Sequence, residues 1–391
     1  MTLKGRAPSI ILLAAITAIA PVTFTIFPPA IVTVAADLGV SIGTVQTTLA
    51  VYLFALAVAQ PLYGPVSDRL GRRGPLLVGL TLYVVGSAIC GLSPNASVMM
   101  LGRLFQAVGV CSGVVIGRAI IRDWFGERAP SVMALVSAVM AVAPSLGAML
   151  GGVLNDWLGW RFVFAMLGFY GACLVLGTFL RMPETLPAPA AGARLSIWRA
   201  WGRLLRHNVF LGQALCGGLL FAGFYGFLAE GPYAMGTLFG QSPSQVGLWF
   251  GLLPASFMTG AFISTRLTRR FAPKAVIQGG NLLGVASVVL MPVAAATGYL
   301  DVYLTMLVLV LVSIAQGISL PPSTAVAIGV EPALAGTASG LIGCIHMGFS
   351  GMAAVLVGQL HDGTLWPMVL ILVVPTLLAP LAAWWAGKST N

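Results

Sequence analysis

The stretch "SDRLGRRGP" (Ser67–Pro75) has a near copy, "STRLTRRFAP" (Ser264–Pro273), and this pair decides how the chain is interpreted. Only 8% of the 391 residues are charged, yet the same basic cluster occurs twice, about half a chain length apart. The first copy has Asp68 where the second has Thr265. A repeat at this spacing predicts a duplicated architecture in which the two clusters are equivalent loops.

The segments around these loops are strongly apolar. Mean hydropathy is +0.98 and 58% of the residues are hydrophobic, whereas soluble domains carry roughly 25% charged residues. A helix needs about 20 apolar residues to cross the bilayer core, and lipid offers no other partner for backbone groups. The sequence therefore predicts an all-α integral membrane protein with twelve transmembrane helices, at about 9–36, 43–65, 75–93, 97–120, 131–154, 161–181, 208–230, 244–265, 275–297, 301–327, 335–358 and 364–386.

The basic residues indicate how these helices are oriented. Nearly all lie before the first predicted span (Lys4, Arg6), after the even-numbered spans, or at the end of the chain, whereas Arg161 falls on the opposite side and Arg103 within a span. Cytoplasmic loops carry such an excess of Lys and Arg, which predicts a multi-pass protein with both termini cytoplasmic. The net charge of +10 is thus explained by anionic membrane lipid, and no nucleic-acid partner is expected.

A second similarity supports two halves of six spans each. "LGRLFQAVG", with Gln106, resembles "LVSIAQGIS", with Gln316, at the equivalent place in the second half. Parallel repeats related by an axis along the membrane normal imply a substrate site between them, near the midplane. We expect an N-terminal bundle (1–182), a cytoplasmic linker (183–207) and a C-terminal bundle (208–391).

The motif in and just before the first loop resembles the G-x-x-x-D-R-x-G-R-[KR] signature of the major facilitator superfamily. Arg103 opens an R-x-x-Q pattern similar to the second motif of that superfamily, and "APSLGAMLGG" (Ala143–Gly152) is similar to the span-5 motif of drug:proton antiporters. "RAIIRDWF", "WRFVF", "PETL" and "AGTASGLIG" resemble the bicyclomycin/chloramphenicol-resistance exporters. The signature residues are Gly64, Asp68, Arg69, Gly71, Arg72 and Arg73.

This resemblance implies the major facilitator fold and a bacterial inner-membrane exporter of small amphipathic compounds, driven by protons through alternating access. Its partners would be a small-molecule substrate, protons and lipid, and the expected state is a monomer. The alternatives are a narrow-specificity exporter of a metabolite or siderophore, a proton-independent facilitator, and a receptor or scaffold that transports nothing. The sequence has no nucleotide signature, metal cluster or nucleophile–base constellation, so we expect no cofactor, no metal and no enzyme activity.

The loop motif is predicted to form a gate at the cytoplasmic surface. Asp68 is placed to accept hydrogen bonds from the N-terminus of a neighbouring helix, where the macrodipole favours an anion. Arg72 or Arg73 is expected to reach Asp123 at the end of span 4. The resemblance implies that these contacts hold the outward-facing state. The alternative is a solvated charged loop, whose ion pairs contribute little.

Arg103 is the main candidate for a polar site inside the membrane. It lies about 9 Å into span 4, where a charge costs several kcal/mol unless it faces a partner or a cavity. By resemblance it tunes proton affinity or polarises the central cavity, with Gln106 and Thr25 as partners. The alternative is a side chain that snorkels to the outer headgroups.

Proton coupling is the hardest property to assign. His346 lies near the middle of span 11 and is the one mid-span side chain that titrates between pH 5 and 8, although a buried histidine also serves structure alone. Related exporters carry an acid in span 1 where "FTIFPPA" (24–30) has Thr25. With Glu230 expected at the outer end of span 7, no Asp or Glu is predicted mid-span. This pattern favours a neutral, zwitterionic or anionic substrate over a multivalent cation.

Two further groups complete the candidates. The span-5 residues Pro144, Gly147, Gly151 and Gly152 permit close helix approach, and by resemblance they limit leak, although close packing alone also explains them. Apolar walls with few polar groups suit amphipathic ligands, although membrane aromatics also face lipid. The aromatic candidates for the substrate cavity are Phe24, Phe27, Tyr52, Phe221, Phe224, Tyr225, Trp249 and Phe250.

Overall fold

The computed structural model describes residues 8–185, 197–331 and 334–388, and it is helical. Within these ranges twelve helical segments are long and apolar enough to cross a membrane, and no strand is present. The predicted all-α class with twelve spans is therefore confirmed. Some of the predictions fall outside the described residues. These are Lys4, Arg6 and Arg194, which contribute to the predicted orientation, and part of the predicted linker (186–196).

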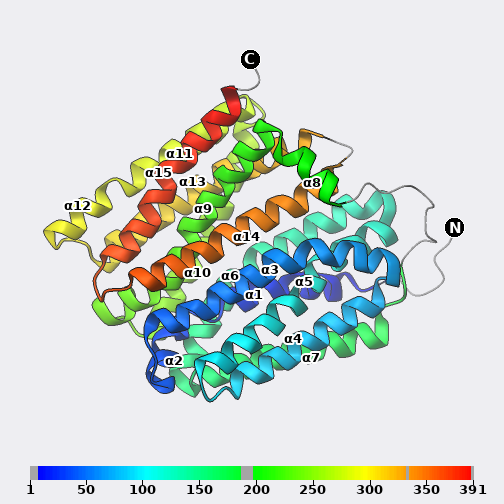
Figure 1. The fold of residues 1–391 in the computed structure, drawn as a ribbon, viewed down its shortest axis with the longest axis horizontal. Coiled ribbons are helices and arrows are strands. Elements are labelled where there is room, and N and C mark those ends of the chain that lie inside the picture. Colours follow the sequence, from blue (N-terminus) through cyan, green and yellow to red (C-terminus); the bar gives the residue numbers. More distant parts are fainter. Residues whose placement is uncertain (1–7, 186–196, 332–333, 389–391) are drawn as a thin grey trace.

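The first bundle (blue to teal in Figure 1) contains six spans. Its first span, predicted as one segment, is divided, because Pro28 and Pro29 lack the N–H groups that would continue a regular helix. The elements are α1 (Ile10–Thr25), η1 (Pro28–Ala30), α2 (Ile31–Leu38), α3 (Ile42–Leu70), α4 (Arg73–Gly91), α5 (Ala96–Phe125), η2 (Gly126–Arg128), α6 (Ala129–Leu158) and α7 (Trp160–Arg181).

The second bundle (green to red in Figure 1) follows the short amphipathic helix α8 (Ile197–Leu205). Ala200 and Leu204 of α8 are buried in a cluster with Phe210 and Ala338 of the second bundle. The elements of the bundle are α9 (Asn208–Tyr233), η3 (Ala234–Leu238), α10 (Pro243–Leu267), α11 (Pro273–Val288), α12 (Leu290–Thr297), α13 (Val302–Gly329), α14 (Ala335–Leu360) and α15 (Trp366–Lys388).

Helix caps show the same repeat that the basic loops revealed. Side-chain oxygens of Ser41 and Asn95 accept a hydrogen bond from the first turns of α3 and α5. Ser242 and Asp301 do the same for α10 and α13, which occupy the equivalent places in the second half. A capping side chain satisfies one of the orphan amides at a helix start, so equivalent spans begin by the same device in both halves.

The molecule has two unlike ends. We call the end with the α3–α4 and α10–α11 connections the basic end, since Arg72, Arg73, Arg266 and Arg270 lie there, and the opposite end the distal end. Figure 1 shows α2 and α12, which are distal, toward the left, and α8 toward the right.

The two bundles meet closely at the distal end. A Cβ on Gly43 of α3 would lie 2.4 Å from the carbonyl oxygen of Gly358 in α14. One on Gly152 of α6 would lie 2.3 Å from that of Pro243 in α10. The amide of Ser244 also donates to Asp156 Oδ2 at 2.9 Å. Because only glycine permits such backbone contact, these seams hold the distal end closed.

Candidate transport site and gates

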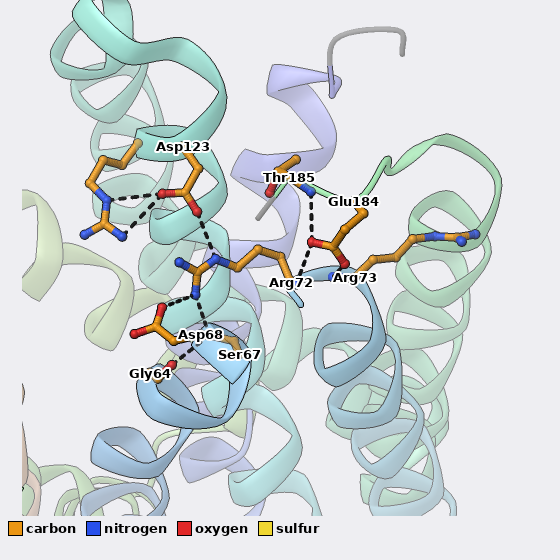
Figure 2. A network of polar contacts seen from close by, with 9 residues as sticks. Gly64, Ser67, Asp68, Arg72, Arg73, Asp123, Glu184 and Thr185 are labelled. Carbon is orange, nitrogen blue, oxygen red and sulfur yellow. Dashed lines mark hydrogen bonds and ion pairs between the residues drawn. The ribbon is translucent and has the colours of Figure 1, made fainter. Parts of the chain in front are cut away.

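The predicted gate forms a compact ion cluster around Arg72 at the basic end. The Arg72 side chain is 3% exposed and lies 2.7 Å from Asp68 Oδ1 and 2.9 Å from Asp123 Oδ2. It also donates to Ser67 Oγ at 2.8 Å (Figure 2). These contacts join the end of α3 to the end of α5. Removing one partner of a buried ion pair strongly destabilises a protein. The cluster therefore differs from a solvated charged loop.

A residue that the sequence analysis did not assign also belongs to this ion cluster. Glu184 accepts hydrogen bonds from the amides of Arg72 at 2.8 Å and Arg73 at 3.2 Å (Figure 2), at the N-terminus of α4. Gly71 makes room for this carboxylate: it has φ +90°, and a Cβ there would lie 2.5 Å from Glu184 Oε2. The helix-capping role was expected of Asp68, and the Asp68 carboxylate pairs with Arg72. Glu184 belongs to the "PETL" segment (183–186) that resembles the related exporters, and this segment was the sequence signal that could have indicated it.

The remaining motif residues lie at the surface of this cluster. Arg73 donates to the Phe179 carbonyl at 2.7 Å and covers the ring of the same residue. Arg69 is exposed. The carbonyl of Gly64 accepts from Ser67 Oγ at 3.1 Å. Arg72 thus links α3 and α5 at the basic end.

The second copy of the motif has a different structure. Thr265 is exposed and its hydroxyl donates to the Phe262 carbonyl of its own helix at 2.7 Å. Ser264 donates to the Ile318 carbonyl of α13 at 2.8 Å, and Arg266 lies over the Phe262 ring. Within the described part of this loop no ion pair is found. The charged cluster is therefore a property of the first bundle.

Arg103 lies in an aromatic cage inside the first bundle. Its side chain is fully buried, and its guanidinium carbon lies 3.9 Å from the ring centre of Phe27, 5.0 Å from that of Phe164 and 5.6 Å from that of Tyr52. Nη1 donates to Gln106 Oε1 at 3.2 Å, whereas Nε and Nη2 have no hydrogen-bond partner. A snorkelling side chain would be exposed, so that alternative does not describe this structure.

Gln106 connects this cage to its surroundings, and Thr25 does not belong to it. The Gln106 amide donates to Ser87 Oγ at 2.8 Å. The Thr25 hydroxyl instead donates to the Pro21 carbonyl at 2.9 Å and lies against Gly147 of α6. The structure thus brings Arg103 and Gln106 together and places Thr25 at a helix contact.

The span-5 glycines make the contacts between α6 and its neighbours. A Cβ on Gly147 would lie 2.5 Å from Thr25 Oγ1, and one on Gly151 would lie 2.0 Å from the Ile26 carbonyl oxygen. Gly152 faces Pro243 of the other bundle, as described above. Pro144 lies within the same helix. One helix face therefore packs on α1, and the adjoining position packs across the two bundles.

Replacing Gly151 with alanine is expected to destabilise the protein by at least about 1–3 kcal/mol, the usual range for overpacking. The new methyl group meets backbone, which cannot rotate away. The measurement is the thermal unfolding midpoint of the purified chain in detergent. Gly279→Ala in α11 is the matched control, because a Cβ at that position would have no heavy atom within 4 Å. Equal midpoints for the two variants would contradict the contact.

Aromatic side chains form a continuous row that crosses from one bundle to the other. Ring centres are 6.3 Å apart for Tyr52 and Phe24, and 4.4 Å apart for Phe24 and Tyr225. Tyr225 stacks on Phe221 at 5.5 Å, and Phe221 stacks on His346 at 4.6 Å. We call these five residues the aromatic row. Phe224 contacts Tyr225 edge-on from the same helix.

Three of the aromatic candidates lie elsewhere. Phe27 contributes to the Arg103 cage. Phe250 packs on Phe227 within the second bundle at 5.4 Å. Trp249 donates to Gln241 Oε1 at 3.1 Å and contacts the exposed Tyr303. The sequence located these aromatics in membrane helices but carried no signal for which face of each helix they occupy.

A groove of about 790 Å³ lies along α3, α4 and α5, apart from the aromatic row. Apolar side chains such as Val58, Leu62 and Val78 line it, and each of these is more than half exposed. In a bilayer such a surface contacts acyl chains.

Glu230 does not lie at the end of its span, where it was expected. The seventh span was expected to end at residue 230, but α9 continues through Tyr233 and η3 to Leu238, so Glu230 lies within it. Its side chain is fully buried and accepts a hydrogen bond from Gln46 of the other bundle, and its Oε1 lies 2.8 Å from His361 Nδ1. Pro232 was the misleading signal, since membrane helices tolerate proline.

The comparisons with known proteins agree with this architecture. The model of the Major Facilitator Superfamily matches residues 13–355. The chain belongs to the Major Facilitator Superfamily. It is 30% identical over 383 residues to multidrug resistance protein D of Escherichia coli strain K12, covering 95% of each chain. It is 29% identical to the chloramphenicol resistance protein of Pseudomonas aeruginosa, covering 93% of this chain and 87% of that one.

The solved structures support the fold of this superfamily member. A bacterial homologue of the human lysosomal transporter Spinster, in an inward-facing and occupied conformation, superposes with a TM-score of 0.80 at 16% identity. The match covers all of this chain and 98% of that one. The protein is therefore a multi-pass membrane transporter of the major facilitator fold that acts on a small-molecule substrate.

Proposed function

We propose that this superfamily member exports small amphipathic compounds from a bacterial cell, in exchange for protons. The observation that carries the proposal is the aromatic row, which joins Tyr52 and Phe24 of the first bundle to Tyr225, Phe221 and His346 of the second. Ligand sites with apolar walls and few polar groups suit such compounds. Relatives named for multidrug and chloramphenicol resistance support the same substrate class.

The proposed orientation follows from the charges. The basic end faces the cytoplasm, so both termini are cytoplasmic and the protein lies in the inner membrane. The closed seams at Gly43 and Gly152 are then on the outside, which corresponds to an inward-facing state. The ion cluster around Arg72 is intact in this state, so the expectation that its contacts break on inward opening does not hold here. The moving bodies are residues 1–182 and 208–391, joined by the linker 183–207, and the unit is a monomer.

Arg103 supports a neutral, zwitterionic or anionic substrate. Its guanidinium is held by aromatic rings and Gln106, with two nitrogens left without a partner. A buried cation of this kind repels cationic compounds and attracts a partial or full negative charge. Arg103, Gln106 and His346 are the polar groups we assign to the central site.

The function is tested by transport in proteoliposomes that contain the purified chain, with and without an imposed proton gradient. The panel contains chloramphenicol together with neutral, anionic and multivalent cationic amphiphiles. We expect flux of several neutral or anionic compounds, accelerated by the gradient and absent for the multivalent cations. Flux without a gradient response would favour a facilitator, and transport of a single compound would favour a narrow exporter.

A further inference from the structure

We propose that Glu230, His361 and Gln46 form a proton-binding site that controls closure of the distal end. The inference rests on the proposed function, because it names the group that accepts the incoming proton of the exchange. We call these three residues the distal triad. Gln46 belongs to α3 of the first bundle, Glu230 to α9 of the second, and His361 follows α14 directly.

The distal triad bridges the two bundles. Gln46 Nε2 donates to Glu230 Oε2 and, at 3.1 Å, to the carbonyl oxygen of Ala229. His361 Nδ1 lies 2.8 Å from Glu230 Oε1. The closest backbone seam, between Gly43 and Gly358, lies one helical turn from Gln46. The distal end therefore cannot open without separating Gln46 from Glu230.

The hydrogen-bond inventory of the triad lacks one donor. The acceptors are the two Glu230 oxygens, the Ala229 carbonyl and Gln46 Oε1, and the last is buried without a partner. The donors are the two N–H groups of the Gln46 amide and, in the tautomer that carries its proton on Nδ1, the His361 ring. Buried polar atoms are normally paired. A proton on Glu230 would add an O–H donor to the set.

The charge around Glu230 also favours a bound proton when the distal end is closed. His361 is the one basic side chain that contacts it in the described structure, and the Tyr233 ring packs edge-on against that imidazole. Asp362 adds a negative charge from the same loop, and hydrogen bonds from the Thr364 side chain and backbone lower the pKa of its carboxyl.

The other charged groups at the distal end have their own partners, and Asp301 accepts from the Leu304 amide at 2.8 Å. Asp37 pairs with Arg161 and accepts from Trp160, and Asp156 accepts from Ser244.

The direction of the proton effect follows from burial. Glu230 is fully enclosed when the bundles meet, and enclosing a carboxylate without a permanent cation carries a large desolvation penalty. A proton taken from the distal solution removes that penalty, with no covalent change. The closed form therefore binds one proton more tightly than the open form, so acid closes the distal end and base opens it.

The test is a distance measurement between the two bundles on the purified full chain in lipid nanodiscs. Spin labels are attached at Leu92→Cys and Tyr299→Cys, which are strongly exposed at the distal ends of the first and second bundles. Cys173 and Cys344, the accessible native thiols, are replaced by serine. No substrate is added, so a wrong assignment of the transported compound leaves the result unaffected.

We expect the ratio of closed to open molecules to fall as pH rises, by up to about tenfold per pH unit for one coupled proton. Glu230→Gln, which mimics the protonated acid, should hold the distal end closed at every pH. Asp362→Asn is the control and should keep the wild-type slope. Gln46→Leu should lower the closed fraction while the slope persists, because Glu230 remains.

An unchanged pH slope in Glu230→Gln would overturn the inference. It would do so even if the same variant still exported compounds under a proton gradient, and the proposed function would then stand without this site. Loss of the slope in Asp362→Asn but not in Glu230→Gln would equally reject Glu230 as the proton acceptor.

Discussion

Replacing Arg103 with methionine is expected to reduce transport strongly without lowering the thermal stability of the protein. A hydrogen bond to a charged group contributes about 1.5–3 kcal/mol, so loss of one substrate contact should reduce flux about 10- to 100-fold. The same substitution should not lower the free energy of unfolding. Nε and Nη2 of the buried guanidinium are unpaired, and an uncompensated buried charge weakens folding by several kcal/mol.

The aromatic cage reduces that penalty but does not remove it. Cation–π contacts contribute about 0.5–2 kcal/mol. The guanidinium carbon of Arg103 lies 3.9 Å from the centre of the Phe27 ring. Methionine fills irregular apolar space well, so it should pack among the same rings. Arg103→Lys keeps the charge but loses the planar fork, and it should retain only part of the flux.

Initial rates in proteoliposomes and the unfolding midpoint in detergent are measured together for this prediction. The matched control is Arg269→Met, which removes the same charge from an exposed site in the α10–α11 connection, and it should change neither quantity. A lower midpoint with normal flux in Arg103→Met would show that the arginine serves folding alone.

The sequence predicted the spans and the gate partners because local patterns determine them. A run of about 20 apolar residues has few alternatives to a membrane helix. Asp123 follows a span on the same side as Arg72, so topology alone placed the two charges at one surface, and they lie 2.9 Å apart.

Local patterns do not predict contacts that depend on how a helix is rotated about its axis or on the residue at which a span ends. Trp249 and Phe250 are neighbours in sequence, yet one contacts the exposed Tyr303 and the other the buried Phe227. Glu230 was assigned to a span end because Pro232 follows it, although the helix continues past both residues. Rotation and length are set by packing between distant segments, which one sequence does not display.

Replacing Asp68 with asparagine is expected to reduce transport more than tenfold while the protein still inserts in the membrane. Asparagine keeps an oxygen that accepts from Arg72, so the fold survives. The change nevertheless leaves a guanidinium that is 3% exposed with Asp123 as its remaining anion in the cluster. Weakening a buried pair typically costs about 3–5 kcal/mol, and the 28% exposure of Asp68 reduces that figure through solvent screening.

The duplicated loop supplies a control for this prediction within the same molecule. Thr265→Asn introduces the same side chain at the equivalent place in the second bundle, where the threonine is exposed and bonded to its own helix. Surface changes of this kind usually lie within about 0.5 kcal/mol, so flux should stay within about twofold. Initial rates are compared at equal amounts of reconstituted protein. Equal losses in both variants would mean that the two loops act alike. A loss confined to Asp68→Asn would show that the gate is the ion cluster around Arg72 and not the basic residues that both loops share.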